Sequence, residues 1–143
     1  MPPLHDSVHI GDIAHIPAGE DLTGKEAHLL ELSHDSGAPE FILPTAETTL
    51  VAHVCIYGNE DAELVTARPL ESGKQIRIRA KGAGNPGDRL CLADPSTAAD
   101  KGKVRALPAA AATYRCFAIA EETFVDGQVV AARYTGPEDI VVE

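Results

Sequence analysis

The chain has 143 residues, enough for one domain with its own hydrophobic core, and no second domain is needed to account for its length. Its formal net charge of −10 argues against a nucleic-acid partner, because binding to phosphates needs clustered Lys and Arg. No apolar run approaches the roughly 18 residues of a membrane span. The N-terminus also lacks the basic region followed by an apolar stretch that is typical of a secretion signal. We therefore expect neither a nucleic-acid nor a membrane partner.

Residues 1 to 21 are predicted to form an N-terminal arm, because they lack Lys and Arg and carry apolar residues at scattered positions. A flexible terminus and a segment that orders on a partner explain this composition about equally well. In the second case the branched apolar side chains are the candidate partner contacts. These are Leu4, Val8, Ile10, Ile13 and Ile16.

Residues 22 to 143 are predicted to form a single all-β domain, because short apolar runs are separated by most of the 12 Gly and 10 Pro. Helical signals are limited to single turns near residues 95–100 and 108–112. Trp is absent and aromatic residues make up only 4%, so small side chains must fill the core. The expected strands cover residues 27–32, 41–43, 50–57, 64–67, 74–80, 90–93, 104–107, 114–120, 128–134 and 140–142.

A duplication is visible in this all-β region. The pattern Leu-Pro-x-Ala-x-x-Thr begins at Leu43 and again at Leu107. Residues 73–82 and 127–136 are each bracketed by two glycines and alternate with a period of two, which is typical of a strand with one buried face. The sequence therefore predicts a small β-barrel-like domain built from two similar β units, at about residues 22–82 and 85–136.

The three cysteines, Cys55, Cys91 and Cys116, lie in separate strand-like runs without CxxC spacing. An odd number in this pattern predicts buried free thiols in a protein made in a reducing cytoplasm. His53 and Cys55 would share one face of a strand, as a Cys-His hydrolase requires. A packed core pair is the favoured interpretation, because no third orienting group is evident.

Two further patterns resemble ligand sites. His5 and His9 have the spacing of a metal-binding pair on a helix, but Gly11 disfavours that helix. Residues 82–87 match GxGxxG, but a strand-like run follows instead of the helix that a dinucleotide site needs. We expect no catalytic residue, cofactor or metal. A small-molecule-binding β domain, such as a sugar-binding one, and a Cys-His hydrolase remain as alternatives.

Basic residues are concentrated in the expected strand at 74–80, where Arg77 and Arg79 lie opposite the apolar face, and Arg133 takes the matching position in the second unit. A solvated face that discourages edge pairing explains this stripe. The alternative is contact with the acidic surface of a second copy. Arg77, Arg79 and Arg133 are therefore the candidate subunit-interface residues.

Several short patterns occur along the chain in a characteristic order. They are Ala-Gly-Glu-Asp-Leu-Thr-Gly-Lys at 18–25, Leu-Pro-Thr-Ala at 43–46, the strand that ends at Gly82, Gly-Lys-Val at 102–104, residues 114–122, and Gly-Gln-Val-Val at 127–130. Together they resemble the head-decoration, or capsid-cement, proteins of tailed bacteriophages. One difference is that Ala118 and Ala120 stand where that family often has a strand glycine.

The resemblance implies a fold of the β-tulip type and a homotrimer on the outside of an assembled head, where the protein binds the major capsid protein and resists internal DNA pressure. It implies that residues 2 to 17 grip the capsid, and that the protein is synthesised in the host cytoplasm and resides in the virion.

Overall fold

The computed structural model describes residues 13 to 143, and within them regular structure is almost entirely β. This confirms the predicted all-β class. The single helical element is a 3₁₀ turn, Ala98–Asp100. The ten strands are β1 Ala14–Pro17, β2 Leu29–Ser33, β3 Glu40–Ile42, β4 His53–Tyr57, β5 Leu64–Pro69, β6 Gln75–Arg79, β7 Arg89–Leu92, β8 Val104–Ala106, β9 Ala112–Ala120 and β10 Val129–Val142.

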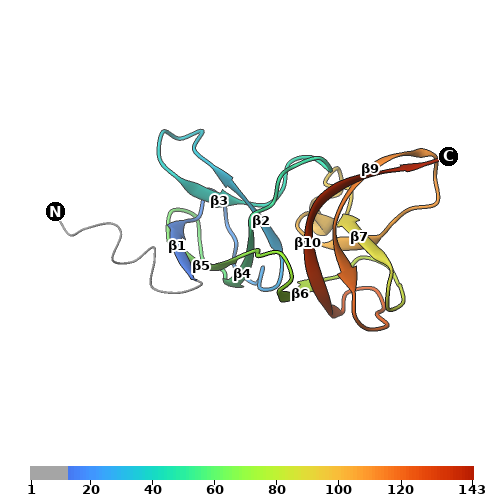
Figure 1. Ribbon diagram of the computed structural model, residues 1–143. Helices are drawn as coiled ribbons and strands as arrows, with labels where there is room; N and C mark the ends of the chain where they lie inside the picture. The colour runs from blue at the N-terminus through green and yellow to red at the C-terminus, as the bar shows by residue number, and fades with distance from the viewer. Residues whose placement is uncertain (1–12) are drawn as a thin grey trace.

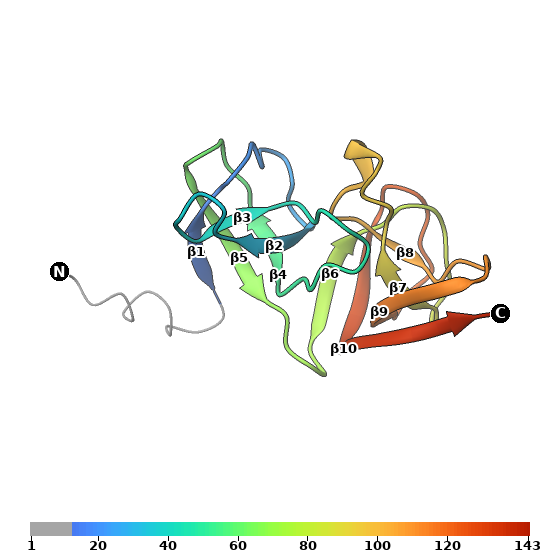
Figure 2. The same ribbon diagram turned by 90° about the horizontal axis from the view of Figure 1, so that it is seen from above.

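The strands form two five-stranded antiparallel sheets that lie side by side (Figures 1 and 2). The first has the order β1-β5-β4-β2-β3 and the second the order β6-β10-β9-β7-β8. Adding five to each strand number of the first sheet reproduces the second. The domain is therefore built from two β units of one topology, as the sequence predicts.

Each sheet curls until its edge strands meet. Ala18, just after β1, forms an isolated parallel bridge with Phe41 of β3, and Ala80, just after β6, forms the same bridge with Val104 of β8. The next residue donates a hydrogen bond across the seam in both units, at 2.8 Å to the Phe41 carbonyl and 2.7 Å to the Val104 carbonyl. Each unit is consequently a small barrel-like body whose edge strands are joined at one point.

The division between the sheets differs from the predicted repeat boundaries. Strand pairing joins β6 to β10, so residues 75–79 belong to the second sheet, although the repeat pattern assigned them to the first unit. The glycine-bracketed segments that matched each other, 73–82 and 127–136, are thus neighbours in one sheet. The Leu-Pro element is a true equivalent, because Leu43 follows β3 and Leu107 follows β8.

The predicted arm also contributes to the sheet. β1 lies within residues 1–21 and pairs with β5 in the register Ala14↔Ala67 to Pro17↔Leu64. The expected boundary at residue 21 missed this strand, because four residues are too few to show a period of two. Three of the predicted contact residues, Leu4, Val8 and Ile10, lie outside the described residues.

A strand-loop-strand motif occurs four times, as β1–β2, β4–β5, β6–β7 and β9–β10. Near the end of each loop lies a residue of positive φ. Its N–H donates to a carbonyl in or just after the first strand of the other motif in the same unit. The four donors and acceptors are Ala27 to Cys55 (2.8 Å), Ala62 to Ala18 (2.9 Å), Gly87 to Ala120 (2.8 Å) and Gly127 to Ala80 (2.9 Å).

Two clusters of buried hydrophobic residues form the core of the protein. The smaller fills the first barrel around Phe41 and Val65. The larger fills the second barrel and extends to Leu29 and Val54 of the first sheet and to Val51, just before β4. Backbone hydrogen bonds reinforce this junction, for example from the Leu29 N–H to the Gly102 carbonyl at 2.8 Å. The two units therefore share buried apolar surface.

Candidate interaction surfaces

The predicted contact residues of the arm divide between the surface and the core. Ile16 pairs with the fully buried Val65 and packs against the first cluster, so it stabilises its own unit. Ile13 is half-buried and directly precedes β1. Of the two described candidates, Ile13 is therefore the one placed at the rim of the first unit.

An apolar patch covers the outer face of the first sheet beside β1. Leu64 of β5 is 56% exposed and pairs with the exposed Pro17, while Tyr57 of β4 is 59% exposed. A register shift between Cys55 and Tyr57 turns Tyr57 onto this face, opposite Thr66. We call Pro17, Tyr57 and Leu64 the outer patch. The patch is not visible in the sequence, because a bulge changes which side chains share a face.

The alternation predicted for the basic strand is present in β6. Ile76 and Ile78 are buried in the larger cluster, whereas Arg77 is exposed and Arg79 is half-buried on the opposite face. The register of β6 with β10 pairs Arg77 with Ala131. The period of two in the sequence therefore predicts correctly which side chains of β6 face the core and which face outward.

Two of the three predicted interface arginines are engaged within their own chain. The Arg133 guanidinium donates to both carboxylate oxygens of Glu121, at 3.0 to 3.1 Å, and to the Gly73 carbonyl at 2.8 Å. Hydrogen bonds from Gln75 and Arg133 hold the pKa of Glu121 below its usual value. Arg79 donates to the Gly127 carbonyl at 2.8 Å. These contacts tie β6 and its flanking turns to β10.

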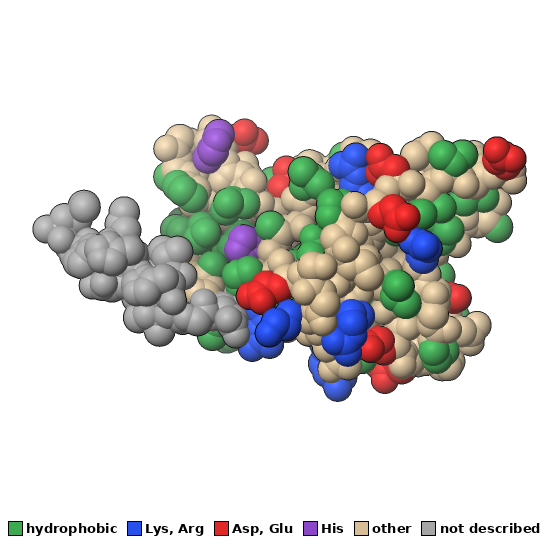
Figure 3. Space-filling view, viewed as in Figure 1, with side chains coloured by type: hydrophobic (Ala, Val, Ile, Leu, Met, Phe, Trp, Pro, Cys, Tyr) green, Lys and Arg blue, Asp and Glu red, His purple; other side chains and the backbone are tan. Residues whose placement is uncertain are grey.

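The third, Arg77, lines an open groove between the two units. Two adjoining hollows of about 210 and 290 Å³ meet there, and Arg68 of β5 contributes to both. Lys74 lines one hollow and Arg77 the other, and none of the three basic side chains has an ion-pair partner among residues 13–143. Figure 3 shows Lys and Arg side chains gathered along the lower edge of this face.

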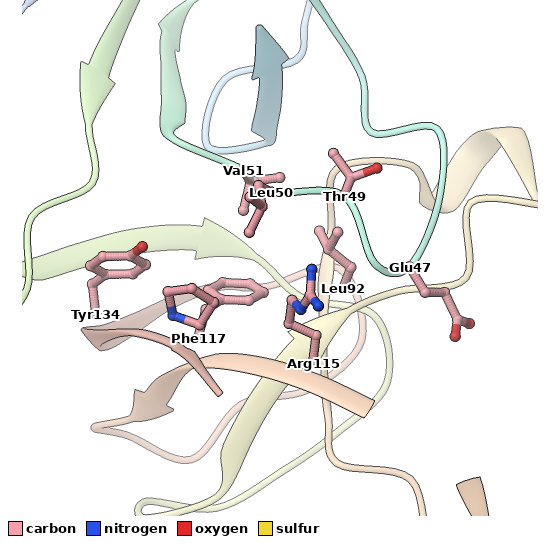
Figure 4. Close-up of a pocket in the computed structure, with 9 residues that line it drawn as sticks. Glu47, Thr49, Leu50, Val51, Leu92, Arg115, Phe117 and Tyr134 are labelled. Carbon is pink, nitrogen blue, oxygen red and sulfur yellow. The ribbon is translucent and has the colours of Figure 1, made fainter. Parts of the chain in front are cut away.

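A smaller hollow lies between the segment before β4 and the second sheet (Figure 4). Val51, Phe117 and Tyr134 surround it, and Arg115 closes one side by donating to the Thr48 carbonyl at 2.8 Å. Its volume of about 30 Å³ accommodates one or two water molecules, which is less than a sugar ring needs.

The His53 and Cys55 pair has the environment of packed core groups. The His53 ring lies edge-on against Phe41, with centroids 4.9 Å apart, and burial lowers its pKa. Burial raises the pKa of the Cys55 thiol to about 12, the opposite of what an activated nucleophile requires. These observations favour the core interpretation over the hydrolase alternative.

The remaining sequence patterns typical of metal or dinucleotide sites do not form such sites in the part of the chain that the structure describes. Residues 13–143 contain no cluster of three His, Cys, Asp or Glu side chains arranged for a metal ion, and no helix long and apolar enough to cross a membrane. The GxGxxG segment leads into β7, and Gly84 within it forms a backbone bridge with Phe124. His5 and His9 lie outside the described residues.

Comparison of the whole structure with solved structures gives a match over most of the chain. The base of the head fibre protein gp8.5 of bacteriophage phi29 superimposes with a TM-score of 0.66, over 88% of this chain and 96% of that chain. The two share a fold. Their sequence identity is 16%, so the likeness is one of architecture. No protein-family model matches the sequence, and no curated protein matches it.

Proposed function

We propose that this chain is a structural protein of a phage virion, which binds the outside of an assembled head as a homotrimer and stabilises it. The observation that carries the proposal is the structural likeness to the base of a phage head fibre, which extends over nearly the whole of both chains. The short patterns that resemble head-decoration proteins point to the same class of particle.

The outer patch and the arm are the proposed contact with the major capsid protein. Pro17, Tyr57 and Leu64 expose apolar surface beside β1, and Leu4, Val8, Ile10 and Ile13 precede that strand in the chain. Ile16 is removed from this set, because it packs inside the first unit. An extended segment beside an apolar patch suits recognition of a partner's sheet edge.

The groove between the units is the proposed contact between copies. Arg77 joins Arg68 and Lys74 there, on a chain with a formal net charge of −10. Glu71 and Glu26 also line the two hollows, so the groove has three basic and two acidic side chains. The basic side chains are complementary to the acidic surface of another copy, which favours specific association. Arg79 and Arg133 support this contact indirectly by holding β6 against β10.

Co-sedimentation with expanded heads that lack this protein tests the proposal. We expect the full chain to sediment with the heads in a saturable manner, and light scattering to give three times the monomer mass of 15.1 kDa. A stable monomer that stays in the supernatant would reject both the capsid contact and the trimer.

A matched pair of variants locates the capsid contact. Leu64→Asp places a charge in the outer patch, and we expect it to reduce head binding by at least about tenfold, because an unpaired charge would be desolvated there. Val141→Asp is the control, since Val141 is 67% exposed and lies on the other unit. Equal binding by the two variants would remove the outer patch from the contact.

The groove also keeps a second candidate open, a small-molecule-binding β domain. Arg68 and Arg77 line a hollow of about 290 Å³, which suits an anionic sugar better than a neutral one. Thermal unfolding with and without sugar acids checks this function. A rise in melting temperature that disappears in Arg68→Ala would support it, and unchanged melting temperatures would exclude it.

A further inference from the structure

Cys91 and Cys116 lie directly opposite each other on neighbouring antiparallel strands, β7 and β9. Both residues are buried, with 3% and 2% of their surface exposed. Directly opposed residues of such strands have Cα atoms about 4.5 to 5.5 Å apart, and disulfides span about 4.4 to 6.8 Å between Cα atoms. A register shift between Leu90 and Cys91 places a bulge directly beside this pair, and the two cysteines are still register partners. Strand pairing therefore brings the two thiols to about the separation that a disulfide spans.

A fixed guanidinium lies beside this pair. Arg105 of β8 is the register partner of Cys91, so the two side chains share a face of the sheet. Its Nη2 donates to Glu47 at 2.8 Å, and its guanidinium lies 5.8 Å from the centre of the Tyr114 ring. Its buried Nε has no hydrogen-bond partner among residues 13–143. The pKa of the Cys91 thiol stays above its ordinary value because the thiol is buried, while the charge of Arg105 acts to lower the pKa and the Glu47 carboxylate acts to raise it.

The two thiols differ in their surroundings. Burial raises the pKa of both, and the value for Cys116 is about 11. At Cys91 the charge of Arg105 opposes the effect of burial and lowers the pKa again in part. Cys91 is thus the better candidate for the first reaction with an oxidant, and Cys116 for the second. Cys55 lies in the core of the other unit, where it has no cysteine in register with it.

We propose that Cys91 and Cys116 form an oxidation site, at which a hydroperoxide converts the two thiols into an intramolecular disulfide that joins β7 to β9. The Cys91 thiolate attacks one peroxide oxygen, the O–O bond breaks, and a sulfenic acid and hydroxide form. The Cys116 thiolate then attacks the Cys91 sulfur and displaces the hydroxyl group, which leaves as water. Overall, two thiols are oxidised and one hydrogen peroxide is reduced to two water molecules.

The fold offers an access path and a consequence. β8 has three residues and is the last strand in the order of its sheet, where the bridge between Ala80 and Val104 joins it to the end of β6. Transient opening of this short strand would admit a molecule as small as hydrogen peroxide. The disulfide would connect strands whose intervening segment contains η1 and β8. Closing this loop constrains the unfolded chain, so we expect the melting temperature to rise by about 10 °C.

The test is hydrogen peroxide treatment of the full chain, followed by alkylation and mass spectrometry. We expect the intact mass to fall by two hydrogen atoms, a Cys91–Cys116 linked peptide to appear, and a reducing thiol to reverse both changes. Three alkylated cysteines after treatment, oxygen addition without a linked peptide, or a link between separate molecules would each overturn the proposal.

Variants separate the roles of the residues. Cys55→Ser should form the disulfide at the wild-type rate, while Cys116→Ala should accumulate oxygen at Cys91 and form no link. Arg105→Gln should move the pH dependence of the reaction to higher pH, because the Cys91 thiolate loses its neighbouring cation. An unchanged pH profile in a folded Arg105→Gln protein would remove Arg105 from the site, and an unchanged link in Cys116→Ala would refute the pairing.

Discussion

Ala27 and Ala62 adopt positive φ angles of 63° and 68°, a region that disfavours residues with a Cβ atom by about 1 to 2 kcal/mol. Gly87 and Gly127 occupy the corresponding loop position in the second unit. The two alanines are therefore points of backbone strain that the second unit avoids. Each still donates the hydrogen bond that closes its loop.

We expect Ala62→Gly to raise the free energy of unfolding by about 0.5 kcal/mol, because relief of strain exceeds the added entropy of the unfolded chain. Urea denaturation measures the change. Ala110→Gly is the control, since Ala110 is exposed and is not among the residues of positive φ, and it should be neutral or destabilising. Equal effects of the two substitutions would contradict the assignment of strain.

The buried His28 and the half-buried His53 predict a pH dependence of stability. Burial lowers the pKa of His28 and His53 below the ordinary value of 6.5, so both are neutral in the folded protein when they begin to protonate in the unfolded chain. Their contribution is complete above pH 6.5 and is lost as the pH falls toward the folded-state pKa.

We therefore expect the urea concentration at the unfolding midpoint to decrease when the pH is lowered from 7.5 to 5.5. The decrease should be smaller in His53→Leu. His34→Gln serves as the control, because His34 is exposed. If His53→Leu retained the complete wild-type pH dependence, the explanation would not hold for that residue.

At the scale of elements, the strand-loop-strand motif depends on a close approach between loops of the second unit. Gly84 bridges to Phe124, whose side chain is 1% exposed, and a Cβ at position 84 would lie 2.4 Å from the Phe124 ring. Position 84 therefore requires glycine, because the Phe124 ring occupies the space that a side chain would need. In the sequence this glycine is part of a GxGxxG pattern, whereas its structural role depends on a partner forty residues away in the chain.

We expect Gly84→Ala to lower the free energy of unfolding by about 1 to 3 kcal/mol through overpacking. Phe124→Leu should reduce that penalty in the double variant, because the smaller side chain vacates the space that the new methyl group needs. A double-mutant cycle by urea denaturation measures the coupling. Additive effects would show that Gly84 and Phe124 do not compete for one space.

At the scale of the whole molecule, the shared core predicts that both units unfold together. Leu29 belongs to the first sheet, is fully buried, and packs in the cluster that fills the second barrel. Leu29→Ala should cost about 2 to 5 kcal/mol and destabilise both units equally. We expect calorimetry to show one transition in the wild type and in the variant, with calorimetric and van't Hoff enthalpies in agreement. Two separate transitions would mean that the units fold independently.

The sequence by itself determined the features that depend on residues close together in the chain. The alternation of Ile76, Arg77 and Ile78 predicts a strand with one buried face, since successive side chains of an extended backbone point to opposite sides. The Leu-Pro elements at Leu43 and Leu107 mark the ends of equivalent strands, so two similar β units could be predicted. Buried cysteines were predictable for the same reason, because each lies in an apolar run.

Only the tertiary structure decided which strands pair. The local pattern of β6 is the same whichever strand lies beside it, and its pairing with β10 moves the boundary between the units. The same holds for the outer patch, which a bulge in β4 creates, and for Cys91 and Cys116, which meet through the register of β7 with β9. Contacts between residues distant in sequence determine these features, and a period of two carries no information about them.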